Sequence, residues 1–249
     1  MVEGGHALSV MGNHEFNAIA YATLKSDQSD HLRPHTEKNH KQHHKFLEAF
    51  ANDPEGYEDA IQWFKTLPLW LELDGIRVIH ACWDQRWIGR IQSEYGGNLL
   101  TSKLLTQGAT SGTWEYDALE TLLKGKEIPL PEGFSFQDKD KNERKHIRVR
   151  WWPPTANTHR AAFMGPESAR SHIPDEPIEG DHLIQYSHDE PPVFLGHYWM
   201  EGDPQLLAAN IACLDYSVGN AGGKLVAYRW NGEQLLDSRN FIWTDRKES

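Results

Sequence analysis

The stretch HALSVMGNHEFNAIAY (residues 6–21) decides how this chain folds in our interpretation. HALSVM is short and mostly apolar and predicts a β-strand, whereas EFNAIAYATL (15–24) predicts a helix. Gly12, Asn13 and His14 stand between the two segments. Open α/β sheets carry their ligand sites at this position, directly after a strand. The stretch therefore predicts an α/β fold with a site at Asn13 and His14.

The rest of the chain first predicts helices and then strands. Residues 35–50, 54–67 and 84–125 predict helices, the last with breaks at Gly96-Gly97 and Gly108. Asp74-Gly75 predicts a tight hairpin between LWLEL and IRVIH. Strands are predicted in HIRVRWW, PVFLGH, LAANIACLDYS, KLVAYRW and EQLLDSR, with a second hairpin at Asn231-Gly232 joining the last two. Together these elements predict one domain over residues 1–249, in which sheets pack between helices. Residues 126–146 are polar and predict a surface loop or an insertion.

Composition narrows the class of protein. The net charge of −11 disfavours non-specific binding to nucleic acid or to an anionic membrane, because the field of the protein repels phosphate. No apolar run reaches about 18 residues, the length that would predict a membrane span, and MVEGGHALSV does not resemble a signal peptide. Cys82 and Cys213 form no CxxC pair, which fits a reduced, cytoplasmic setting.

Three predicted strands are followed by residues that can bind a metal ion. Asn13 follows HALSVM, His80 ends IRVIH, and His197 follows PVFLG. A set of nitrogen and oxygen ligands suits Mn, Fe or Zn better than Ca. Each residue also has a structural interpretation, in which Asn13 caps a helix and each histidine is a buried side chain bonded to a backbone carbonyl. Three such strand ends together favour a metal site.

A second group of histidines has a simpler explanation. His40, His43 and His44 are spaced so that they could share one face of the helix predicted at 35–50. Their neighbours Lys38, Lys41 and Lys45 repel a cation, so we interpret this face as a solvated one.

The motif order GNHE, VIHACWD, VFLGHYW and ANIACLDYSVGNAGGKLVAYRW resembles calcineurin-like metallophosphoesterases. The resemblance is to the bacterial branch related to PPP-type Ser/Thr phosphatases and to diadenosine tetraphosphatase/PrpE-like enzymes. It implies a four-layer αββα sandwich and two divalent metals (Mn, Fe or Zn) that activate a water molecule for attack on phosphorus. It also implies a phosphorylated substrate: a phosphoprotein, a dinucleoside polyphosphate or a small phosphoester.

The resemblance assigns roles to individual residues. Asn13, His80 and His197 correspond to the ligands of one metal, and His14 corresponds to the acid that protonates the leaving oxygen. Arg148 and Arg150 could contact phosphate. Because a strand turns only one face inward, a salt-bridged surface pair is the alternative for these two arginines. Asp215 matches an acidic position with a structural role.

The family's GDxHG and GDxxDRG motifs, which carry the other ligands, do not occur in this sequence. The chain thus carries ligands for about one metal, and the resemblance implies that an N-terminal βαβα portion of roughly 60 residues is missing. Two functions stay open at this point. One is a phosphatase that is active in its complete form and impaired as this chain. The other is an inactive, truncated pseudoenzyme that binds at most one metal or a phosphorylated partner.

Overall fold

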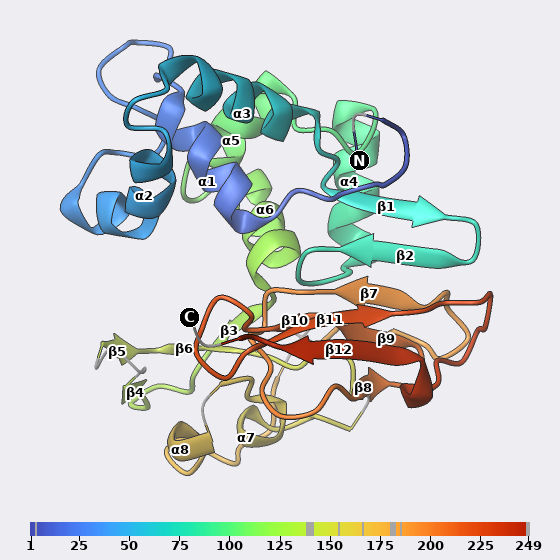
Figure 1. Ribbon diagram of the computed structural model, residues 1–249. Helices are drawn as coiled ribbons and strands as arrows, with labels where there is room; N and C mark the ends of the chain where they lie inside the picture. The colour runs from blue at the N-terminus through green and yellow to red at the C-terminus, as the bar shows by residue number, and fades with distance from the viewer. Residues whose placement is uncertain are drawn as a thin grey trace. The chain divides into compact units, whose positions relative to one another are not determined.

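The computed structural model describes residues 1–2, 4–137, 142–153, 155–165, 167–179, 183–184 and 186–247. The described chain has a mixed α/β fold, as the sequence predicts (Figure 1). It divides into two compact units. The first, here the helical unit, comprises Met1–Glu72 and Val78–Leu123; the second, here the strand-rich unit, comprises Leu73–Arg77 and Lys124–Ser249. The expectation of a single domain stays a prediction.

The helical unit takes its name from helices α1 to α6 (Figure 1). Their bounds are α1 Asn13–Ala22, α2 Glu37–Ala49, α3 Pro54–Thr66, α4 Gln85–Tyr95, α5 Ser102–Gly108 and α6 Trp114–Lys124. Side-chain caps fix several of the starts: Thr36 accepts a hydrogen bond from Asn39 N, and Asp53 accepts one from Gly56 N. α4 ends at Gly96, whose φ of 77° suits glycine. The predicted helices are therefore confirmed, breaks included.

The strand predicted for HALSVM is wrong. Residues 7–12 belong to no strand, and the backbone bond that ties them down joins Met11 N to Pro68 O at 2.8 Å. A strand exists only when its backbone groups pair with a neighbouring strand. Within the described residues this segment finds no such ladder, and Leu8 is 65% exposed.

The strand-rich unit contains a mixed sheet. β7 (Val193–Leu195) runs parallel to β9 (Ile211–Cys213), and β8 (Leu206–Ala208) pairs with β9 antiparallel. Every residue of β7 and β9 is buried, which explains their unbroken apolar sequence.

β1 (Trp70–Leu73) and β2 (Ile76–Ile79) flank the Asp74-Gly75 turn, where Gly75 has a φ of 81°. The predicted turn is thus confirmed.

A second, antiparallel sheet corrects the prediction for the C-terminal end. β11 (Lys224–Tyr228) pairs with β10 (Asp215–Tyr216) and with β12 (Phe241–Asp245), so EQLLDSR is not a strand and no tight hairpin forms at Asn231-Gly232. Glu233 organises the connection instead, accepting hydrogen bonds from Asn231 N and from the Tyr228 hydroxyl. The connection ends in a 3-10 turn, η1 (Ser238–Asn240).

Residues 126–146 contain paired strands as well as loops. β3 (Glu127–Pro129) pairs with β6 (His146–Arg148), and β4 (Phe136–Gln137) pairs with β5 (Glu143–Arg144). Ile128 and Ile147 are buried in a core that also receives Phe163. The short helices α7 (His159–Ala162) and α8 (Glu167–Arg170) follow in the chain. This stretch therefore contributes to the core through Ile128, and Ile147 follows directly after its end. That the stretch is an insertion stays a prediction.

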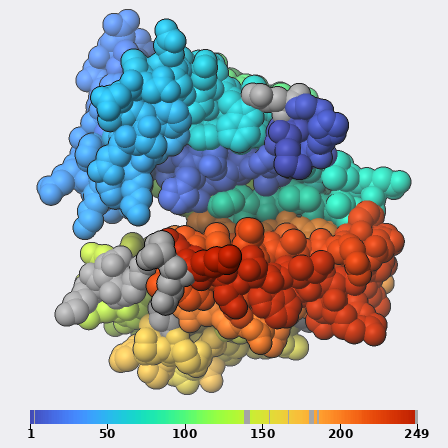
Figure 2. Space-filling view, in the orientation of Figure 1, coloured from blue at the N-terminus to red at the C-terminus, as the bar shows by residue number. Residues whose placement is uncertain are grey.

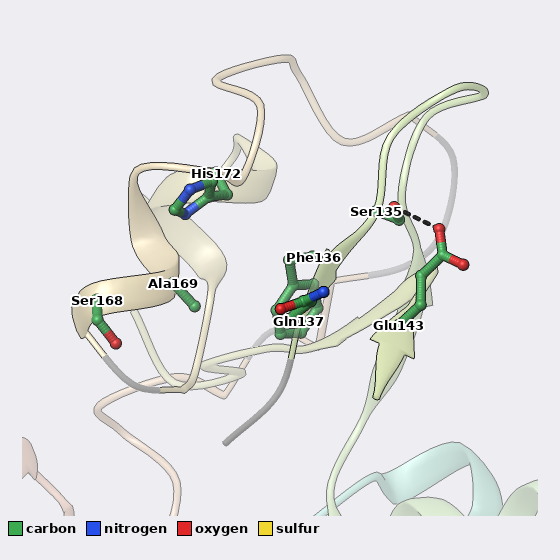
Figure 3. A pocket seen from close by; sticks show the side chains of 7 residues that line it. All are labelled: Ser135, Phe136, Gln137, Glu143, Ser168, Ala169 and His172. Atoms are coloured by element: carbon green, nitrogen blue, oxygen red, sulfur yellow. Dashed lines mark hydrogen bonds between the residues drawn. The ribbon is translucent and has the colours of Figure 1, made fainter. Parts of the chain in front are cut away.

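A shallow hollow of about 430 Å³ lies between the β4–β5 hairpin and the neighbourhood of α8 (Figure 3). Its polar lining includes Ser135 and His172. Ser135 donates a hydrogen bond to Glu143, which also lines the hollow. None of the site residues predicted from the sequence lines it.

No helix in the described ranges combines the length and the apolar character needed to cross a bilayer.

The burial of Ile128 gives a test of this arrangement. Ile128→Ala should lower the free energy of unfolding by about 2–5 kcal/mol, because it leaves a cavity in a packed core. Ile242→Ala is the matched control, since Ile242 is 58% exposed and should change stability by less than about 0.5 kcal/mol. Urea unfolding followed by circular dichroism measures both, and equal losses would contradict a core role for residue 128.

Candidate functional site

The GNHE motif forms a tight turn at the start of α1 in the helical unit. Asn13 is the first residue of α1, and Gly12 N donates a hydrogen bond to Glu15 Oε2 at 2.9 Å. This is the bond that the glutamate of a capping box makes back to the N-cap. The turn brings Asn13 close to His80, the residue that follows β2. Asn13 Oδ1 lies 2.9 Å from His80 Nε2.

Gly12 has no room for a side chain. A Cβ at this position would lie 2.6 Å from Glu15 Oε2 and 2.9 Å from His80 Cε1, closer than real Cβ contacts. The glycine of GNHE therefore lets both the glutamate and the histidine close in on the backbone. The contact of Glu15 with Gly12 is a finding of the structure.

Asn13 and His80 are joined by a hydrogen bond of ordinary length, 2.9 Å between Oδ1 and Nε2. Two ligands held at right angles by bonds of ~2.1 Å also lie about 3 Å apart, so this separation is compatible with a shared metal ion. Without an ion, His80 Nε2–H donates to Asn13 Oδ1; an ion would take the place of that proton. Nowhere in the described part of the chain do three or more His, Cys, Asp or Glu side chains gather into a possible metal site. Two of the predicted ligands thus come together, in a set without a carboxylate.

His14, the second residue of α1, is exposed, in contrast to its neighbour Asn13. Its side chain is therefore open to a substrate from solvent. His14 also acts electrostatically on the ring of His43, which comes from α2.

His197 lies in the strand-rich unit, two residues after β7, in an uncommon backbone conformation. Its φ is 70°, and Tyr198 N donates a hydrogen bond to Gly196 O at 2.9 Å, which closes a γ-turn around His197. A non-glycine residue with positive φ stores strain, and such strain concentrates at functional sites.

The surroundings of His197 hold this turn in place. Tyr198 accepts a hydrogen bond from Trp151 Nε1 at 3.1 Å, and Met200 N donates one to Asp215 O. Asp215 also accepts a hydrogen bond from Ser217 N, so the structural role expected of Asp215 fits its contacts.

Of the two arginines assigned to phosphate, Arg148 forms an ion pair. Arg148 Nη2 donates to Glu127 Oε1 at 3.2 Å, which is the salt bridge weighed as the alternative. Arg148 and Tyr198 both lie close to Gly125, since a Cβ there would meet both side chains. Burial lowers the pKa of Arg150, and the neighbouring Arg170 lowers it further against the effect of Glu167. The phosphate-binding role of both arginines stays a prediction.

The histidine face of α2 is only partly the solvated face that the sequence favours. His40 is exposed and His44 Nδ1 bonds to Lys41 O, but the His43 ring packs against Tyr21 and Phe46. Burial lowers the pKa of His43 to about 4, and Arg33, His14, His35 and His40 act in the same direction. The sequence had not drawn attention to Arg33.

No model of a known protein family matches the chain, and no curated protein matches it closely enough to count as a relative. The roles of the site residues therefore depend on the motifs and on the geometry described above.

Because Gly12 is crowded and Gly89 is not, a change to alanine should have opposite effects on stability at the two positions. Gly12→Ala should lower the free energy of unfolding by about 1–3 kcal/mol, because Glu15 and His80 must move. Gly89→Ala, inside α4, meets nothing within 4 Å and should stabilise the protein by about 0.5–1 kcal/mol. Thermal unfolding compares the two, and a neutral Gly12→Ala would show that the turn has more room than the structure gives it.

The pKa of His43 predicts a pH dependence of stability. The unfolded chain takes up a proton at about pH 6.5, whereas folded His43 takes it up only near pH 4. Between these values the unfolded state binds more protons, so stability is full above about pH 6.5 and falls as the pH drops towards 4. His43→Gln should flatten this part of the profile in urea unfolding between pH 7 and pH 4, and an unchanged profile would exclude a depressed pKa.

Proposed function

We propose that this chain is a metal-dependent phosphoesterase of the metallophosphoesterase type, and that Asn13, His80 and His197 bind one divalent ion. The observation that carries the proposal is the 2.9 Å approach of Asn13 Oδ1 to His80 Nε2 at the GNHE turn. His197 belongs to the other unit and has a φ of 70°. That His197 binds the same ion, and that the fold is an αββα sandwich, rests on the motif order.

The residues of the chain would divide the work of hydrolysis. A divalent ion (Mn, Fe or Zn), when bound, supplies charge for the phosphate oxygens and a water of lowered pKa. Asn13 and His80 present an oxygen and a nitrogen to it, fixed by the Gly12–Glu15 contact. His14 is exposed beside Asn13 and would give its proton to the leaving oxygen, because histidine exchanges protons near neutral pH.

The proposal extends to substrate and setting. The substrate would be a phosphoprotein, a dinucleoside polyphosphate or a small phosphoester. A cytoplasmic location fits Cys82 and Cys213, which are both buried and free. A second metal would need ligands beyond the three residues matched by the motifs.

A non-catalytic function is the second candidate. It is favoured by the donor set itself, because the described residues contain no group of three or more His, Cys, Asp or Glu side chains that could hold a metal ion. A protein of this kind would bind one metal or a phosphorylated partner without turnover.

Calorimetric titration with Mn²⁺ and hydrolysis of an aryl phosphate separate these functions. The wild-type chain should bind about one Mn²⁺ and hydrolyse the ester in a Mn²⁺-dependent reaction. His80→Ala and His197→Ala should each abolish Mn²⁺ binding. His14→Ala should keep the ion and lower kcat by about 10²- to 10⁴-fold, the range expected for loss of a general acid.

His188→Ala is the control for removal of a histidine, since its side chain is 73% exposed and belongs to no predicted site. Mn²⁺ binding without any turnover would favour the non-catalytic function. Binding that survives both His80→Ala and His197→Ala would overturn the ligand assignment.

A further inference from the structure

Arg33 is a half-buried cation whose side chain is held by neutral groups. Its Nη1 donates to Asn17 Oδ1 of α1 at 3.0 Å, and its Nη2 donates to Gln42 Oε1 of α2 at 2.6 Å. Among the described residues, no carboxylate lies within ion-pair distance of it. Burial lowers the pKa of Arg33, while Glu120 and Tyr116 act through space in the opposite direction.

This arrangement orients the guanidinium without cancelling its charge. Buried arginines are ordinarily paired with an acid, because an unpaired buried charge is costly. Two amide oxygens fix the plane of the group and use one N–H of each terminal nitrogen, so other N–H donors remain for a ligand. A planar guanidinium held in this way is suited to phosphate oxygens, which it binds with two parallel hydrogen bonds.

Further basic side chains gather around Arg33 in the same unit. His35 stacks on Tyr21 at 3.7 Å and on His31 at 3.9 Å, and the His43 ring lies 4.9 Å from Tyr21. His14, His35, His40 and Arg33 all lie close enough to His43 to oppose its protonation. His43 Nε2 is buried and has no hydrogen-bond partner among the described residues. Arg33 and these histidines bring hydrogen-bond donors and the positive charge of Arg33 together next to α2. Figure 2 shows that α2 lies at the surface of the protein.

We propose that Arg33, together with His14 and His43, forms an anion subsite for a phosphoryl group next to the one that is hydrolysed. The proposal deepens the proposed function and rests on it for the identity of the reacting ester. His14 is the group assigned to the leaving oxygen, so an anion bound near His14 belongs to the leaving group. The substrate class is therefore a phosphate ester or anhydride whose leaving group carries its own phosphate.

A cation is a poor occupant for this cluster. Arg33 is positively charged near neutral pH, so it disfavours a metal ion at His43. An oligophosphate instead supplies the counter-charge that the neutral partners Asn17 and Gln42 do not.

Calorimetric titration with pyrophosphate, in EDTA and at low ionic strength, tests the subsite without any metal. Wild-type protein should bind pyrophosphate, and Arg33→Gln should weaken binding at least about tenfold, as expected for loss of a charge-assisted contact. Lys41→Gln is the matched control: it removes the same charge from an exposed position on α2 and should change Kd less than about twofold. Equal effects of the two substitutions would show that binding depends on the net charge of the protein and not on the position of Arg33. That result would overturn the subsite.

Asn17→Asp provides a test in which Arg33 is retained. The new carboxylate replaces an amide oxygen that lies 3.0 Å from Arg33 Nη1, so it should neutralise the guanidinium in place. Pyrophosphate binding should fall at least about tenfold, while the melting temperature stays the same or rises. Wild-type affinity in this variant would contradict the proposal even if Arg33→Gln failed to fold.

The failure of this proposal can be told apart from that of the phosphoesterase proposal. Binding in EDTA does not depend on the metal ligands, so Arg33-dependent binding without Mn²⁺-dependent hydrolysis would reject only the enzymatic function. Hydrolysis without Arg33-dependent pyrophosphate binding would reject only the subsite. Where both hold, Arg33→Gln should raise KM about tenfold for an oligophosphate ester, with kcat and the KM for an aryl monophosphate nearly unchanged.

Discussion

The hydrogen bond between Asn13 Oδ1 and His80 Nε2 joins two parts of the chain that are 67 residues apart, and the candidate site depends on it. It forms because Gly12 leaves space that a Cβ would fill, and because Glu15 turns back to bond the Gly12 amide. In such close packing a shift of one group must move the others. The contacts of Gly12, Asn13, Glu15 and His80 therefore constrain one another.

Local sequence was enough to predict the helices and most of the turn at the GNHE motif. Thr36, Asp53 and Gly96 mark helix ends through contacts within a few residues, so the chemistry that fixes them is visible in sequence. The same holds for the Asp74-Gly75 turn, which needs only a glycine with positive φ. Where each contact is local, the pattern of residue types determines the structure.

The incorrect predictions concern segments whose structure depends on which other segment they pair with. HALSVM has the composition of a strand, but composition does not supply a neighbour. Apart from the local bond from His6 N to Met1 O, the described residues offer its backbone the Met11–Pro68 bond. Asn231-Gly232 would suit a hairpin, yet Glu233 binds Asn231 N and Tyr228, and Phe241–Asp245 takes the place beside β11. The first result depends on a partner far along the chain, whereas the second depends on the side chain of Glu233, two residues from Asn231, and on β12, which pairs with β11.

The γ-turn at His197 is a further feature beyond local prediction. Gly196 suggests a tight turn, but the residue with φ of 70° is the histidine that follows it. A non-glycine residue adopts this conformation only when its surroundings compensate for the cost. Trp151 and Asp215 provide that support through Tyr198 and Met200, and neither is recognisable as a partner from its own sequence context.

Arg33 shows how local charge can differ from the charge of the whole molecule. A chain of net charge −11 repels anions on average, so an anionic ligand needs a place where the local potential is positive. Asn17 and Gln42 leave the charge of Arg33 intact, whereas a carboxylate in either position would have cancelled it. Arg148, in contrast, is paired with the carboxylate of Glu127. By this criterion, the neutral partners of Arg33 mark it as the better of the two for binding phosphate.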